Sequence, residues 1–282
     1  MAVPRPRAFA QVDVFASTPL GGNPVAVVLD GADLDADTMA AFARCTNLSE
    51  TTFVLPPDTP GADYRLRIFT PGAELPFAGH PTLGSAHAWL EAGGVPRDPA
   101  LLVQTCAAGP VRVRRTGSSL AFAAPPTVRS GPLDDALLAR VTAALGVHAD
   151  AVVAHQWVDN GPGWLALQLA SADAVLALEP DLAAVPDLKI GVLGAHPDGH
   201  PLRWEVRAFA PALGLGEDPV TGSLNASLAQ WLLREDRTPS RYRVGQGARV
   251  GRSGVLDVEQ DAEGTVWVGG ATTTLVRGTV TL

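Results

Sequence analysis

The chain has 282 residues, a length that favours about two domains. Hydrophobic residues make up 46% and charged residues 18%, which excludes a disordered chain, a collagen-like repeat and a charge-rich coiled coil. With 21 basic against 29 acidic residues the formal net charge is −8. Nucleic-acid backbones and anionic membrane surfaces need basic protein surfaces, so neither is expected as a partner.

The sequence predicts a protein of a reducing compartment. Cys45 and Cys106 are too few for a disulfide scaffold and are expected to lie in the core. No apolar run reaches the length of a membrane span, and none follows the N-terminus as in a signal peptide. We therefore expect a soluble cytoplasmic protein. Lys189, the only lysine, lies in an apolar strand-like run, which argues against Schiff-base chemistry.

Many short apolar runs separated by glycine and proline predict a sheet-rich fold. The turn signal at 159–163 predicts a hairpin. Helices are expected at 37–45, 82–91, 134–145 and 223–234. The second and fourth are rich in glycine, serine and alanine, which suits helices enclosed by other structure. The expected strands are 8–16, 24–30, 51–56, 64–71, 101–106, 110–117, 119–125, 151–159, 164–170, 189–195, 203–211, 242–247, 254–260, 265–270 and 275–282.

The chain contains a short motif that occurs twice. RIFTP at 67–71 returns as RAFAP at 207–211, and each copy leads into a loop with acidic residues and glycine that opens a small-residue helix. The two loops can be aligned with Gly79 on Gly222, or with the P-x-x-G-S string at 81–85 on the one at 219–223. The sequence leaves both alignments open, and a chance echo remains the alternative to two related halves.

These loops have the residue types of an acid–base site. A helix N-terminus binds anions through its backbone N–H groups, and the loops add Glu74, His80, Glu217 and Asp218. His80 could instead cap its helix, and Asp218 could be a helix-start residue. Glu50 lies between a helix and a strand among apolar neighbours, where a carboxylate is costly unless it is paired or functional. An exposed turn glutamate is the alternative.

At these residues the chain resembles the phenazine-biosynthesis-like (PhzF-like) isomerase family. The resemblance runs through nearly the whole chain in family order. The matching strings are GGNPVAVVL (Gly21–Leu29), NLSETTFV (Asn47–Val54), RIFTPGAELPFAGHPTLGSAHAWL (Arg67–Leu90), DNGPGWLALQL (Asp159–Leu169), EVRAFAPALGLGEDPVTGSLNASLAQWL (Glu205–Leu232) and QGARVGRSGVLDV (Gln246–Val258).

The resemblance implies an α+β fold of the diaminopimelate-epimerase-like type. Two pseudo-symmetric halves, each a β-barrel-like mixed sheet around a central helix, are then expected. The first half would comprise residues 1–125, completed by the C-terminal strand at about 273–282. The second would comprise residues 126–272, with the active site in the cleft between the halves.

The resemblance also implies roles for individual residues. Glu50 matches the family's proton-transferring residue, and His80 and Asp218 are expected to assist it. The residues expected to bind a substrate carboxylate are Gly79, Thr221, Gly222 and Ser223. Related epimerases use one cysteine from each half, but neither of the two matching loops contains a thiol.

The leading hypothesis is a cofactor-independent isomerase that shifts a proton within a small, cyclic carboxylate. A ligand-binding or regulatory protein, and an epimerase acting on an amino acid without the cysteine pair, are the alternatives. No metal is expected, because His80 and His87 have no third ligand at a suitable spacing. No nucleotide cofactor is expected, because the glycines at 214 and 216 do not complete a G-x-G-x-x-G fingerprint. The family resemblance implies a homodimer.

Overall fold

The chain divides into two compact units in the computed structural model, which describes residues 4–117, 119–213 and 216–282. Unit 1 contains the chain up to Ala123 together with Gly269–Leu282, and unit 2 is Ala124–Val268. Residues 214 and 215 of the second acid-and-glycine loop lie outside the described residues. Among the described residues, no helix is both long enough and apolar enough to cross a membrane.

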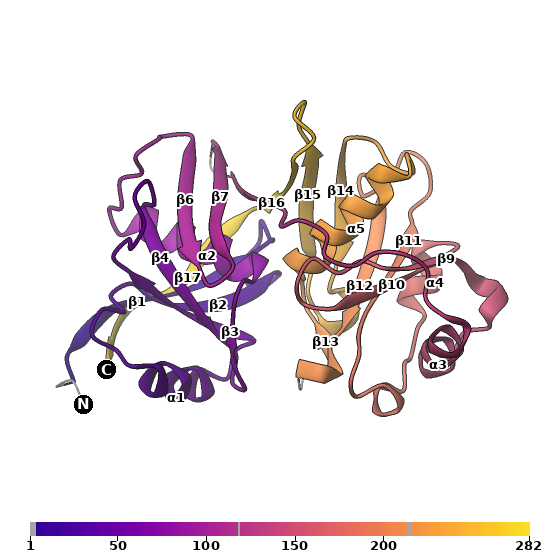
Figure 1. Cartoon of the computed structure of the whole chain (residues 1–282), viewed down its shortest axis with the longest axis horizontal. Coiled ribbons are helices and arrows are strands. Elements are labelled where there is room, and N and C mark those ends of the chain that lie inside the picture. The colour runs from indigo at the N-terminus through magenta and orange to yellow at the C-terminus, as the bar shows by residue number, and fades with distance from the viewer. Residues whose placement is uncertain (1–3, 118, 214–215) are drawn as a thin grey trace. The chain divides into compact units, whose positions relative to one another are not determined.

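Unit 1 is built on one mixed sheet. Strand β1 lies antiparallel to both β17 and β2, so the first and last strands of the chain are neighbours (Figure 1). The sheet continues through β3, parallel to β2, then antiparallel β4, parallel β6 and antiparallel β7 and β8. The strands are β1 (Pro6–Val14), β2 (Asn23–Val28), β3 (Glu50–Leu55), β4 (Tyr64–Phe69), β5 (Glu74–Leu75), β6 (Leu101–Cys106), β7 (Gly109–Thr116), β8 (Ser119–Ala123) and β17 (Thr272–Thr281).

Helix α2 (Gly79–Glu91) is the central helix of unit 1. It contacts strands from both ends of the sheet, including β17, β1, β2 and β8, and most of its residues are buried. A Cβ atom at Gly84 would come within 2.3 Å of Val25, so a larger residue does not fit there. The small residues of this helix therefore let the strands surround it closely. The helix begins three residues before its predicted start, because Pro81 occupies the first turn, where a missing N–H costs little.

Helix α1 (Ala36–Thr46) covers another part of the unit 1 sheet. Its buried Met39 and Ala43 pack in an apolar cluster with Phe53 and Phe69. Cys45 lies on the opposite, exposed side of α1, so its predicted place in the core is wrong. Cys106 ends β6 and is only partly buried, so it too lies outside the core.

Unit 2 repeats the same strand pattern. Strand β9 is antiparallel to β10, β10 is parallel to β11, and β11 is antiparallel to β12. Next come β14, parallel to β12, and antiparallel β15. The strands are β9 (Val152–Trp157), β10 (Trp164–Leu169), β11 (Lys189–Ala195), β12 (Trp204–Phe209), β13 (Glu217–Asp218), β14 (Arg241–Gln246) and β15 (Gly254–Gln260), and β16 (Val266–Gly270) runs from the end of unit 2 into unit 1.

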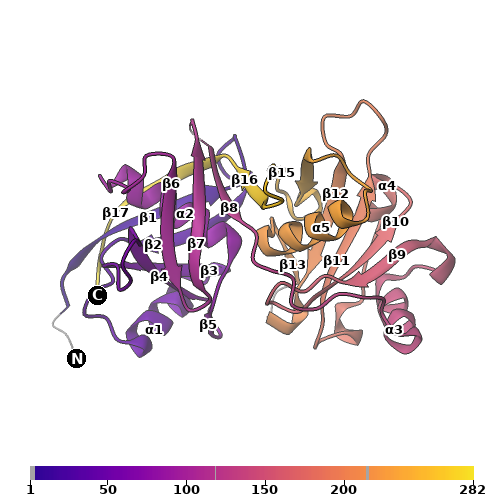
Figure 2. The same ribbon diagram turned by 45° about the horizontal axis from the view of Figure 1, so that its top comes forward.

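Helix α5 (Gly222–Arg234) is the counterpart of α2 and lies along the unit 2 sheet (Figure 2). A Cβ atom at Gly191 of β11 would come within 2.5 Å of Leu224, so the strand and the helix pack closely. Helix α4, only five residues long, was not predicted, because it is too short to show a helical period. The remaining helices are α3 (Asp135–Leu145), α4 (Ala172–Leu176), and the 3₁₀ turns η1 (Ala149–Ala151), η2 (Leu182–Ala184), η3 (Pro211–Leu213) and η4 (Ala248–Val250).

The shared topology confirms the predicted fold class of two similar α+β halves, each with a central helix. It also decides how the two loops align. Glu74 and Glu217 hold the same place in the short strands β5 and β13, paired with Phe69 and Phe209. In each unit the central helix begins with a glycine five residues after that glutamate. Gly79 therefore corresponds to Gly222, and the P-x-x-G-S strings do not correspond.

The arginines of the echoed motifs form equivalent ion pairs. Arg67 binds Glu74 through two hydrogen bonds of 2.7 Å, and Arg207 binds Glu217 through bonds of 3.0 and 2.7 Å. The unit 1 pair is partly exposed, whereas the side chains of Arg207 and Glu217 are only 5% and 9% exposed. Both glutamates are thus committed to ion pairs with arginine.

Candidate active site

A buried acid–base pair lies in unit 1. Glu50 is the first residue of β3, beside Val25 of the parallel strand β2, and it is 8% exposed. His80, the second residue of α2, is 4% exposed, and its Nε2 lies 3.3 Å from Glu50 Oε2. Glu50 is therefore not an exposed turn residue. His80 does not cap its helix either, because the N-cap residue is Ala78 and no side chain caps α2.

The proton state of His80 follows from its surroundings. Burial lowers the pKa of its imidazole to about 3, although a hydrogen bond to the Pro24 carbonyl opposes this shift. Because Nε2 faces Glu50, Nδ1 is the nitrogen that donates to Pro24. A neutral ring with its proton on Nδ1 presents a lone pair at Nε2. The facing oxygen and nitrogen can then share one proton, as a general acid–base pair requires.

The low pKa of His80 predicts acid sensitivity of folding. An unfolded histidine titrates near ~6.5, so below that pH the unfolded chain takes up a proton that the native site refuses. This contribution to stability is complete above ~6.5 and is lost, at about 1.4 kcal/mol per pH unit, as pH falls toward the folded value. Urea unfolding between pH 7 and 5 should show a shallower loss in His80→Gln than in the wild type. The exposed His148→Gln is the control, and equal slopes in His80→Gln and the wild type would contradict this.

A second polar cluster lies in unit 2 at the start of α5. Thr221 is the N-cap residue, and its hydroxyl donates to Asp218 Oδ2 at 2.5 Å. Gln246, at the end of β14 and 2% exposed, donates to Thr221 Oγ1 at 2.9 Å and to the Asp218 carbonyl at 3.1 Å. Asp218 therefore does not cap α5 itself. Gln246 and Thr221 hold it in place instead.

Ser223 follows in the first turn of α5 and is 9% exposed. The indole N–H of Trp164 donates to its hydroxyl oxygen at 3.1 Å, and Asn160 Nδ2 donates to its carbonyl at 3.1 Å. Sequence reasoning assigned no role to Asn160, Trp164 or Gln246. All three lie in the strings that carry the family resemblance, which is the signal that could have pointed to them.

The starts of the two central helices suit an anion. Gly79 and Gly222 begin α2 and α5, and neither helix has a side-chain cap or an acidic residue in its first turn. The first backbone N–H groups of a helix carry partial positive charge and bind carboxylates. The predicted binding residues Gly79, Gly222 and Ser223 thus lie where a carboxylate would be stabilised.

The structure groups the predicted residues by unit. Glu50, His80 and Gly79 come together in unit 1. Asp218, Thr221, Gly222 and Ser223 come together in unit 2. In the part of the chain that the structure describes, no cluster of three or more His, Cys, Asp or Glu side chains could hold a metal ion.

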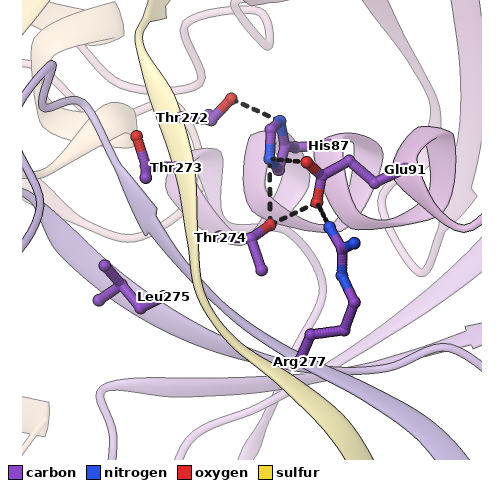
Figure 3. Close-up of a pocket in the computed structure, with 7 residues that line it drawn as sticks. All are labelled: His87, Glu91, Thr272, Thr273, Thr274, Leu275 and Arg277. Carbon is purple, nitrogen blue, oxygen red and sulfur yellow. Dashed lines mark hydrogen bonds and ion pairs between the residues drawn. The ribbon is translucent and has the colours of Figure 1, made fainter.

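A cavity of about 410 Å³ lies at the far end of α2 (Figure 3). Here Glu91 accepts hydrogen bonds from Thr274 and Arg277 of β17, at 2.5 and 2.6 Å. The imidazole of His87 contacts the hydroxyls of Thr272 and Thr274 at 2.9 and 3.2 Å. These polar groups satisfy one another. We therefore interpret them as a network that fastens the last strand to the central helix.

Comparison with known proteins identifies the family. The family model described as "Phenazine biosynthesis-like protein" matches residues 12–278. The chain belongs to this family. It is 37% identical to trans-2,3-dihydro-3-hydroxyanthranilate isomerase of Pseudomonas fluorescens, over 96% of this chain and 98% of that protein. It is 35% identical to Antisense-enhancing sequence 1 of Schizosaccharomyces pombe, over 96% and 97% of the two chains. Several other relatives are also named isomerases, and this protein is an isomerase of the family.

Solved structures agree with this assignment. A phenazine biosynthesis protein of the PhzF family from Enterococcus faecalis superimposes with a TM-score of 0.81 at 27% identity, covering 99% of this chain and 100% of that one. A hydroxyproline epimerase from Agrobacterium vitis superimposes with a TM-score of 0.59 at 14% identity, covering 99% and 93% of the two chains, and so shares the fold. The epimerase-like architecture expected from the sequence is confirmed.

Proposed function

We propose that this protein is a cofactor-independent isomerase that moves a proton within a small cyclic carboxylate by general acid–base catalysis. The observation that carries the proposal is the buried pair of Glu50 and His80, at 3.3 Å. A carboxylate in such a position can take a proton from carbon. The lone pair at Nε2 of the neutral His80 can then accept a hydrogen bond from the protonated carboxyl group until the proton is returned to the substrate.

The proposed step conserves atoms and charge. Glu50 removes a proton from a ring carbon, and the electron pair of the broken C–H bond enters the conjugated system of the substrate. The double bonds shift, and the same proton is delivered from Glu50 to another carbon of that system. No oxidant, reductant or metal is consumed. Asp218, held by Thr221 and Gln246, is proposed to polarise the substrate during this shift.

The substrate carboxylate is proposed to bind at the helix starts. Gly79, Gly222 and Ser223 supply hydrogen-bond donors there, and Thr221 fixes the loop. Several relatives are named for trans-2,3-dihydro-3-hydroxyanthranilate, a ring carboxylate with the conjugated double bonds that such a shift needs. We propose a substrate of this class.

Solvent deuterium tests the proposal. Turnover of trans-2,3-dihydro-3-hydroxyanthranilate in heavy water should give an isomerised product. The carbon that receives the proton stays unlabelled when Glu50 returns the same proton, and it gains deuterium when the Glu50 carboxyl exchanges with solvent before the return. Binding of the compound without isomerisation or exchange would favour a ligand-binding or regulatory protein. Inversion at a single amino-acid centre would favour an epimerase. The epimerase alternative is weakened by the positions of the two cysteines. Cys45 lies on the exposed side of α1 and Cys106 lies at the end of β6, so neither is in the loops that precede α2 and α5.

We also propose a homodimer, on the strength of the family resemblance, and a cytoplasmic location, on the strength of the two unpaired cysteines. Sedimentation equilibrium at micromolar concentration should then give twice the chain mass of 29.2 kDa. A single species of the chain mass would contradict the dimer and leave the proposed chemistry untouched.

A further inference from the structure

The hydroxyl of Ser223 is held by an unusual partner. Trp164, the first residue of β10 and 2% exposed, points its indole Nε1 at Ser223 Oγ, at 3.1 Å. The backbone of Ser223 is fixed as well, because Asn160 Nδ2 donates to its carbonyl at 3.1 Å. Two residues from the hairpin between β9 and β10 thus hold one serine at the start of α5.

The direction of this hydrogen bond has a chemical consequence. An indole nitrogen can only donate, so the Ser223 oxygen must accept. The hydroxyl proton is therefore turned away from Trp164. Among the described residues Ser223 makes no hydrogen bond through that proton. Ser223 therefore has a hydroxyl proton to offer to a ligand, and one of its two acceptor positions is already taken.

The neighbouring hydroxyl is different. Thr221 Oγ1 accepts from Gln246 Nε2 at 2.9 Å and donates to Asp218 Oδ2. This hydroxyl therefore uses both its proton and a lone pair in hydrogen bonds within the protein. Of the two hydroxyls at the start of α5, that of Ser223 is thus the one available to a ligand.

We infer that Trp164 is a specificity-determining positioning residue: its N–H occupies one of the two acceptor positions of the Ser223 oxygen, leaves the hydroxyl proton for the ligand, and so makes the site favour a carboxylate over an uncharged carboxamide. This inference rests on the proposed carboxylate substrate. A carboxylate presents acceptors on both of its oxygens, and the helix N–H groups and Ser223 all donate to it. A carboxamide must turn its own N–H₂ group toward one of these donors, and Trp164 already occupies one of the two lone pairs of the serine oxygen that could accept from that group.

Paired ligands test the inference. The probes are 3-hydroxyanthranilate, the aromatic form of the ring named for the relatives, and its carboxamide, both measured by calorimetry. The wild type should bind the acid more tightly than the amide. In Trp164→Phe, which keeps an aromatic ring but loses the N–H, the ratio of the two affinities should fall on the order of tenfold, as for one hydrogen bond to a charged group. Weaker binding of the acid should raise KM more than it lowers kcat.

A matched control exists in the same unit. Trp204 is also buried and donates its indole N–H to a hydroxyl, that of Thr238, at 3.3 Å. Trp204→Phe should lose a similar hydrogen bond and a similar amount of stability, but the ratio of acid to amide affinity should not change. An equal change of that ratio in Trp204→Phe would overturn the inference.

Ser223→Ala keeps the inference testable if Trp164→Phe does not fold. Removal of the hydroxyl should lower the ratio of acid to amide affinity by the same factor. The double variant Ser223→Ala/Trp164→Phe should show no further decrease of that ratio. The inference would be overturned if Ser223→Ala or Trp164→Phe kept the wild-type ratio of acid to amide affinity. It would also be overturned if the wild type bound neither probe. If Trp164 controls the ratio but no proton shift occurs in heavy water, the isomerase proposal fails and this inference stands.

Discussion

Replacement of Glu50 by glutamine is expected to lower kcat by about 10²–10⁴-fold, the usual contribution of a general acid–base group. The amide fills nearly the same volume and can donate to His80 Nε2, which lies 3.3 Å from the wild-type carboxylate oxygen. It cannot take a proton from carbon. Substrate binding should survive, because the proposed carboxylate site lies on the helix starts, so KM should change far less than kcat.

The control for this experiment is Glu91→Gln. It makes the same chemical change in the same unit, at the other end of α2, in the network with Thr274 and Arg277 (Figure 3). Steady-state kinetics of both variants, with circular dichroism to check folding, separate chemistry from stability. A Glu50→Gln protein with near-normal kcat would remove the proposed mechanism.

Replacement of Arg207 by leucine is expected to destabilise unit 2 by about 3–5 kcal/mol, the cost of leaving one charge of a buried pair without its partner. Glu217 would lose both of its hydrogen bonds to the guanidinium. The carbonyls of Val175 and Leu178 at the end of α4, which accept from Arg207 Nη1 at 3.2 and 2.6 Å, would also lose their donor. Urea or guanidinium unfolding measures the loss.

The repeat supplies the matched control. Arg67→Leu removes the equivalent arginine of unit 1, but its pair with Glu74 is 19% and 38% exposed, so the expected cost is about 1 kcal/mol or less. The double variant Arg207→Leu/Glu217→Leu should recover much of the stability that Arg207→Leu loses, because no buried charge is left alone. Similar costs for Arg207→Leu and Arg67→Leu would show that burial does not govern these pairs.

The sequence by itself determined those features that neighbouring residues encode. Helix α3 was predicted from 134 to 145, and the structure has it from Asp135 to Leu145, with Asp134 as its side-chain cap and Gly146 in the left-handed conformation after it. These signals act over one helical turn, so no distant contact is needed to read them. The repeated motifs at 67–71 and 207–211 also lie in short local strings, and they indicated two similar halves with a chance repeat as the alternative.

Only the tertiary structure decided the roles of the acids. Glu217 and Asp218 are adjacent, yet one pairs with Arg207 and the other with Thr221, because successive side chains of a strand point to opposite faces. The sequence left both as candidates for the acid–base site. Glu50 was equally open between an exposed turn and a buried site, and the pairing of β3 with β2 places it in the interior.

The polar contacts that orient the unit 2 cluster were the least visible in the sequence. Trp164 and Ser223 are 59 residues apart, and Gln246 reaches Asp218 across 28. No local pattern of glycine, proline or apolar residues encodes such a contact, because it exists only once β10, β14 and α5 have packed together. The sequence determined most of the elements that form and indicated that the chain is doubled. The packing of those elements decided which buried side chain faces which.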